Sequence, residues 1–124
     1  MSDSLAQLAQ ALQRFAAERN WGQFHAPKNL ASALVVEAAE LLEPFQWLTE
    51  AQSRDLPPDT KEAVAQEMAD VLLYLVQLST ALDVDLIDAA QRKMVINARK
   101  YPVAQVKGSA QKAEPSPSDQ RPEA

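Results

Sequence analysis

Two pairs of carboxylates sit inside apolar runs of this sequence, at a spacing that fits one face of a helix. Glu37 and Glu40 occur in LVVEAAELL, and Glu67 and Asp70 open the run EMADVLLYLV. Residues three apart lie on the same side of an α-helix, so the members of each pair point one way. If the two helices pack side by side, four carboxylates converge, and Glu43 extends the first row.

A cluster of anions needs cations or protons, because removing one ionised carboxylate from water already costs several kcal/mol. No lysine or arginine occurs between Asn29 and Arg54, or between Lys61 and Leu82, so a divalent metal ion is the better partner. Iron and zinc sites favour histidine or thiolate, but the chain has one histidine, His25, and no cysteine. An all-oxygen site suits Mg²⁺, or Mn²⁺ as a substitute. Since Mg²⁺ is often shared with substrate phosphates, the pattern indicates phosphate-ester or phosphoanhydride chemistry.

Further candidate binding residues are rings in irregular segments and cations near the end of the last predicted helix. Tyr74 lies one turn beyond Asp70 on the same face, and nucleobases stack well on such rings. The other candidates are Trp21, Gly22, Gln23, Phe24, His25, Trp47, Lys93, Asn97 and Lys100. For any single ring, packing in the core or against another subunit is the alternative. Cations at a helix C-terminus equally fit a solvated helix end, where they interact with the helix dipole.

The elements that must position these residues are helices. The chain has 124 residues, is 47% hydrophobic and contains only two glycines, and no alternating strand pattern occurs. Apolar periodicity, capping residues and prolines predict an all-α, four-helix bundle-like fold with helices at about 4–19, 30–43, 60–82 and 86–100. Ser4, Asn29, Asp59 and Asp85 are the predicted N-terminal caps. The third helix is apolar nearly all round, which predicts a buried central position.

The folded body is predicted to comprise residues 1–102. The segment 103–124 has three prolines and almost no large apolar residue, so we expect it to be disordered. A net charge of −5 argues against a nucleic-acid partner. The absence of a membrane-length apolar run and of a leader pattern predicts a cytoplasmic protein with no membrane association. A bundle of about 100 residues barely covers its apolar faces, so we expect a homo-oligomer.

The acidic motifs, together with WGQFHAPKNL, FQW, DVLLYLV and KMVINARKYP, resemble those of the MazG-like, all-α nucleotide pyrophosphohydrolases. The similarity covers roughly residues 5–102 and is closest to the dCTP pyrophosphatase branch. Many members of that branch have a histidine where this chain has Leu12, and some relatives have an acid at Val36. Val95 likewise replaces an acid, and Pro44 is unexpected before FQW.

The resemblance implies cleavage of nucleoside triphosphates between the α and β phosphates, with dCTP or a modified dNTP as the expected substrate. By matching positions, Glu37, Glu40, Glu67 and Asp70 become Mg²⁺ ligands, and we expect Glu40 to activate water. The aromatic loop, Trp47, Tyr74 and the end of the last helix would hold the nucleotide. Family members are dimers or tetramers. Two alternatives to an enzyme stay open: a nucleotide-binding protein without hydrolysis, and a helical oligomerisation module whose acids form solvated faces.

Overall fold

The computed structural model describes residues 4–109, which contain helices and no strand. The elements are α1 (Leu5–Glu18), the 3₁₀ turn η1 (Gly22–Phe24), α2 (Pro27–Leu42), α3 (Glu50–Ser53), α4 (Pro58–Ala81), α5 (Leu86–Lys100) and α6 (Val103–Val106). The predicted all-α class and the four principal helices are confirmed. The chain divides between Val84 and Asp85 into two compact units, the first with α1 to α4 and the second with α5 and α6.

The helix starts at Ser4 and Asp85 follow the capping pattern predicted from the sequence. The Ser4 hydroxyl accepts a hydrogen bond of 3.1 Å from the backbone N–H of Gln7. The Asp85 carboxylate accepts one of 3.0 Å from the backbone N–H of Asp88. These side chains satisfy backbone donors that have no partner inside the helix.

Two predicted helix starts are wrong, and proline explains both. α2 begins at Pro27 after the cap residue Ala26, and α4 begins at Pro58 after Pro57. Proline suits the first helical position, because its missing N–H is one that the helix leaves unpaired and its φ is already helical. Asn29 therefore lies inside α2, where its amide donates a 3.1 Å hydrogen bond to the Phe24 carbonyl.

Short helices also occur in segments that we predicted to be irregular. α3 lies in the connection between α2 and α4 and begins with a capping box, in which Thr49 and Gln52 bond each other's backbone N–H groups. α6 follows Pro102, within the segment predicted to be disordered. The rest of that segment, 110–124, lies outside the described residues, and the domain boundary at 102 stays a prediction.

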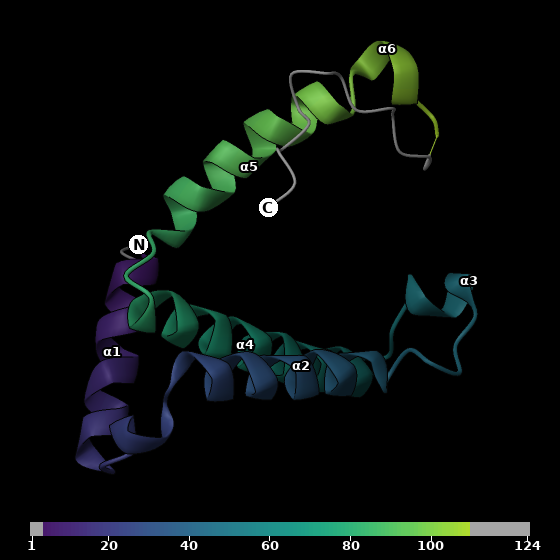
Figure 1. The fold of residues 1–124 in the computed structure, drawn as a ribbon. Coiled ribbons are helices and arrows are strands. Elements are labelled where there is room, and N and C mark those ends of the chain that lie inside the picture. The colour runs from purple at the N-terminus through teal and green to yellow at the C-terminus, as the bar shows by residue number, and fades with distance from the viewer. Residues whose placement is uncertain (1–3, 110–124) are drawn as a thin grey trace. The chain divides into compact units, whose positions relative to one another are not determined.

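α2 and α4 run antiparallel and side by side, and α1 packs across the end where α2 begins and α4 ends (Figure 1). Leu30 from α2 and Val64 and Val76 from α4 are buried. The predicted buried central position of α4 is only partly reached in this chain by itself, since Met68 and Leu72 are 57% and 40% exposed. The reason is that α1 and α2 cover only part of its circumference.

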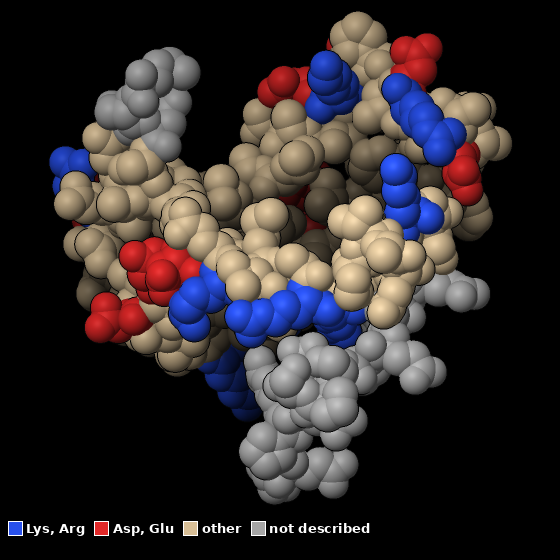
Figure 2. All heavy atoms as spheres, turned by 90° about the horizontal axis from the view of Figure 1, so that it is seen from above, with Lys and Arg blue, Asp and Glu red and all other residues tan. Residues whose placement is uncertain are grey.

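Much of the remaining surface is uncharged. Figure 2 shows charged side chains of both signs on one face, with uncharged side chains covering most of the area between them. In the first unit, large apolar side chains are exposed on both α2 and α4: Val35, Val36, Leu42, Met68 and Leu72. Within residues 4–109, no helix is both long and apolar enough to cross a membrane.

Candidate metal centre and adjoining cavity

Three of the four predicted carboxylates meet between α2 and α4. Glu37 comes from α2, Glu67 and Asp70 come from α4, and each offers an oxygen within 4.8 Å of the other two. The antiparallel packing of the helices brings these distant motifs to the same level. Oxygens at this separation can share a single divalent cation at the usual metal–oxygen distances of about 2.0–2.6 Å.

Two of these carboxylates have an oxygen that is shielded from solvent without a hydrogen-bond partner. These atoms are Glu37 Oε2 and Glu67 Oε2. The salt bridges within residues 4–109 involve other acids, namely Glu18, Glu50 and Asp88. An unpaired buried anion is costly, so the site fits a bound cation that supplies the missing partner. A donor set made of oxygens alone indicates a hard divalent metal.

Two carboxyl groups of this cluster also have raised pKa values. Burial, followed by interaction with Glu40, raises the pKa of Glu37 above its ordinary value of 4.5. Burial also raises the pKa of Glu67, again followed by Glu40 and then by Asp70 and Glu43. Both shifts have the same physical origin, which is that the charged form loses water and gains negative neighbours. Glu40 and Glu43 therefore belong to the same acidic row, as their spacing predicted.

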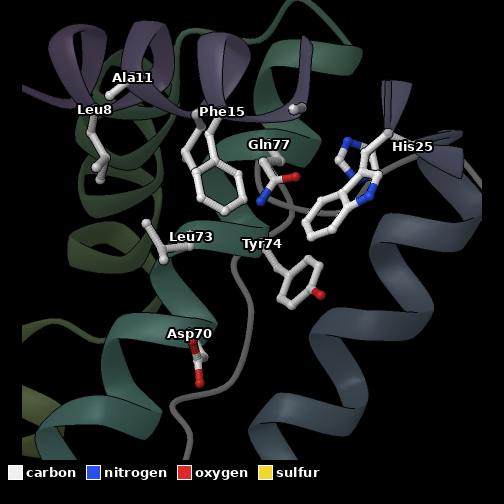
Figure 3. A pocket seen from close by; sticks show the side chains of 11 residues that line it. Leu8, Ala11, Phe15, His25, Asp70, Leu73, Tyr74 and Gln77 are labelled. Carbon is white, nitrogen blue, oxygen red and sulfur yellow. The ribbon is translucent and has the colours of Figure 1, made fainter. Parts of the chain in front are cut away.

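A cavity of about 340 Å³ adjoins the acidic cluster and shares Asp70 with it. Its lining comes from α1, the loop after α1, and α4, and includes the predicted residues Trp21, His25 and Tyr74 (Figure 3). Phe15 and Trp21 pack edge to face, with ring centroids 5.6 Å apart and planes at 67°. The Arg19 guanidinium lies 3.5 Å from the centroid of the Phe15 ring. The cavity thus joins an anionic end to an aromatic wall.

The model of the MazG-like family matches residues 33–114 of this sequence. The chain belongs to the MazG-like family. It is 49% identical over 98 residues to mouse dCTP pyrophosphatase 1, an alignment that covers 77% of this chain and 58% of the relative. Human dCTP pyrophosphatase 1 is 46% identical over 100 residues, covering 79% and 59%. The chain therefore spans less than two thirds of the length of these curated relatives.

A crystal structure of a pyrophosphatase from Archaeoglobus fulgidus shares the fold, with a TM-score of 0.74 and 41% identity. The superposition covers 78% of this chain and 91% of the archaeal chain. The resemblance inferred from the sequence motifs is thus confirmed at the level of family and fold.

The other predicted binding residues in the first unit of this MazG-like chain do not line this cavity. Gly22 lines a second cavity of about 430 Å³ next to the first. The Gln23 amide donates to the Asn20 carbonyl, and Phe24 and Trp47 are exposed, Trp47 at 87%. Lys93, Asn97 and Lys100 belong to α5 in the second unit. The assignment of all these residues to a ligand stays a prediction, as does that of the acids to a metal.

Sequence reasoning missed several residues of the cavity wall. Phe15 on α1 was not among the predicted binding residues, although it lines the cavity and pairs with Trp21. Gln77 on α4 also lines the cavity. A usable signal was present for Gln77, because it follows Asp70 and Tyr74 at helical spacing on an otherwise apolar helix.

Proposed function

We propose that this protein is a Mg²⁺-dependent nucleoside triphosphate pyrophosphohydrolase that converts dCTP or a modified dNTP to the monophosphate and pyrophosphate. The observation that carries the proposal is the group of three carboxylates within 4.8 Å, beside a cavity lined by aromatic rings. The similarity to proteins named dCTP pyrophosphatase 1 supports the choice of substrate.

Mg²⁺ is the proposed metal, with Mn²⁺ as a substitute. Glu37, Glu67 and Asp70 offer oxygen ligands, and the described part of the cluster contains no imidazole or thiolate. Mg²⁺ usually takes one or two carboxylates and completes its shell with water and substrate phosphates. A triphosphate whose α phosphate lies at the acidic end of the cavity fits this arrangement.

In the proposed reaction, a water oxygen attacks the α phosphorus and the bond from that phosphorus to the bridging oxygen breaks. One water is consumed, and pyrophosphate leaves. When bound, the metal would neutralise phosphate charge and lower the pKa of a water. Glu40, beside Glu37 and Glu67, is proposed to orient the attacking water and to accept its proton. Trp21 and Tyr74 hold the nucleoside by stacking, which keeps the α phosphate at the acids.

The test is incubation of the protein with the four dNTPs and Mg²⁺, with the products identified by chromatography. The expected products are a monophosphate and pyrophosphate, and Glu37→Gln and Asp70→Asn should each abolish their formation. Glu62→Gln is the matched control, since Glu62 lies on α4, accepts a hydrogen bond from Gln66 and is outside the cluster. Absence of both products in the wild type, with Mg²⁺ and with Mn²⁺, would refute the proposed activity.

We also propose that the chain forms a homodimer or homotetramer. The support is the exposed apolar surface of α2 and α4, which includes Val36 and Met68 at 55% and 57% exposure. A second copy would remove such side chains from water, with a gain of about 25 cal/mol for each Å² of apolar surface buried. Light scattering should give a mass at least twice 13.6 kDa, and a stable monomer would refute this proposal. The cytoplasmic location stays a prediction from the sequence.

A further inference from the structure

Gln77 is a polar residue of the cavity wall to which neither the metal centre nor the proposed chemistry gives a role. It lies on α4 seven residues after Asp70 and three after Tyr74, and all three side chains line the same cavity. With a rise of 1.5 Å per residue, Asp70 and Gln77 are about 10 Å apart along the helix axis. One face of α4 thus presents a carboxylate, a phenol ring and a carboxamide in that order.

The Gln77 carboxamide has no hydrogen-bond partner within the described part of the chain. Its neighbours on α4 differ, because the hydroxyls of Ser79 and Thr80 both donate to the Val76 carbonyl. Gln77 is half-buried, and its amide is not among the shielded, unpartnered atoms of the described residues, which are Glu37 Oε2 and Glu67 Oε2. With no protein partner, the amide is free to bond to whatever occupies the cavity that it lines, water or a ligand.

Gln77 is one of two residues with a polar side chain in the wall that two adjoining cavities share. In the view of Figure 3, its amide lies between the side chains of Phe15 and His25. Gln77 also lines the second cavity, and the two cavities share Leu12, Ala16 and His25 besides Gln77. It therefore stands at the junction of two adjoining hollows whose shared wall is otherwise apolar apart from the His25 ring.

A carboxamide offers an N–H donor and a carbonyl acceptor side by side. This pair matches a nucleobase edge that carries an acceptor next to a donor, as in the bidentate pairing of Asn or Gln with adenine. The edge of cytosine formed by N3 and the exocyclic amino group has the same pattern. Phe15, Trp21 and Tyr74 supply rings near the amide on which the flat face of a base can stack.

We propose that Gln77 binds the polar edge of the nucleobase and thereby sets the base preference of the cavity. The nucleotide then lies along α4, with its phosphates at Asp70, its middle beside Tyr74 and its base edge at Gln77. This inference rests on the proposed function for the identity of the ligand as a nucleotide. It adds a specificity residue that does not touch the metal or the reacting atoms.

The experiment measures binding of two nucleoside monophosphates by calorimetry in the presence of Mg²⁺, where a monophosphate has no phosphoanhydride bond to be cleaved. One is dCMP, and the other is the 2-pyrimidinone analogue, which lacks the exocyclic amino group of cytosine. The wild type should bind dCMP about tenfold more tightly, the effect expected for one hydrogen bond to a partly buried group. Gln77→Met keeps the length of the side chain but cannot form that bond, so the ratio of the two affinities should fall to near one.

Gln10→Met is the matched control, because Gln10 lies on the exposed side of α1 and lines neither cavity. It should retain the tenfold ratio, and thermal unfolding should show that both variants are folded. An unchanged ratio in folded Gln77→Met, or equal binding of the two ligands by the wild type, would overturn the inference. Because the measurement needs no hydrolysis, a protein that binds dCMP selectively but releases no pyrophosphate would refute the proposed activity and leave the role of Gln77 supported.

Discussion

Glu37→Gln should change the stability of the protein in opposite directions without and with metal. Burial and neighbouring carboxylates raise the pKa of Glu37 above 4.5 in the folded chain. A raised pKa means that the folded state binds the proton more tightly than the unfolded state. The contribution of this group to stability is therefore fully present below pH 4.5 and is lost as the pH rises through the raised value. Without metal, the ionised Glu37 weakens the fold at neutral pH.

The uncharged amide of Glu37→Gln avoids that loss. In EDTA, the melting temperature of the variant should therefore rise relative to that of the wild type as the pH increases from 4.5 to 7.5. Using the difference cancels the titration of carboxylates that the two proteins share. Glu62→Gln, outside the cluster, should show no such trend.

Mg²⁺ should reverse the order of the two melting temperatures, so that the wild type becomes more stable than Glu37→Gln. At a concentration about ten times the dissociation constant, a ligand that binds only the folded state stabilises it by about 1.4 kcal/mol. For a domain of roughly 60–100 residues, this corresponds to an increase in melting temperature of about 6–11 °C. The increase should occur in the wild type and in Glu62→Gln and should be absent in Glu37→Gln. Differential scanning fluorimetry across pH and Mg²⁺ concentration measures both effects on one plate.

Either of two results would refute a metal site at Glu37. A wild-type melting temperature that does not respond to Mg²⁺ or Mn²⁺ at neutral pH removes the metal site. A Glu37→Gln variant that is stabilised by Mg²⁺ as strongly as the wild type places the metal elsewhere.

Three other substitutions test the cavity and the fold. Trp21→Ala should weaken dCMP binding by roughly 5- to 150-fold in calorimetry, because a stacked base contributes about 1–3 kcal/mol; unaltered affinity would mean that the ring does not contact the base. Leu30→Ala should lower the free energy of unfolding in urea by about 2–5 kcal/mol, since Leu30 is 2% exposed and its loss leaves a cavity; a cost below about 1 kcal/mol would contradict that packing. Ser4→Ala should cost about 1 kcal/mol through loss of the cap on α1, whereas Ser4→Asp should restore most of it.

The acidic cluster could be predicted from the sequence because its signal is local and repeated. A spacing of three on a helix fixes the face of each pair, and the lack of nearby cations is visible by inspection. The sequence could not show that Glu37 and Glu67 lie at the same level along the two packed helices. That match depends on the length of the connection between α2 and α4, part of which folds into the unforeseen helix α3.

The aromatic candidates show where local patterns stop being informative. Trp21 and Trp47 are both tryptophans in irregular segments, and the sequence predicted both to be binding residues. In the structure, Trp21 packs on Phe15 from α1, whereas Trp47 is 87% exposed. The difference lies in the preceding chain, since Trp21 follows α1 directly and its backbone N–H donates to the Ala16 carbonyl, which keeps the ring beside Phe15. Gln77 was overlooked although it follows Asp70 and Tyr74 at helical spacing, because spacing alone does not show that a cavity lies in front of that face.

α4 explains why charge is placed in these apolar runs. The helix packs apolar residues toward α1 and α2, and it presents one polar stripe to the cavity. Asp70, Tyr74 and Gln77 occupy that stripe at spacings of four and three, the two steps that keep a residue on one helix face. Each of the three has a different chemical character, and their order along the axis matches the order of phosphate, sugar and base in a nucleotide. The periodicity that buries Val76 against the core therefore also aligns the proposed subsites, so the same packing that holds the helix in place sets the register of the ligand.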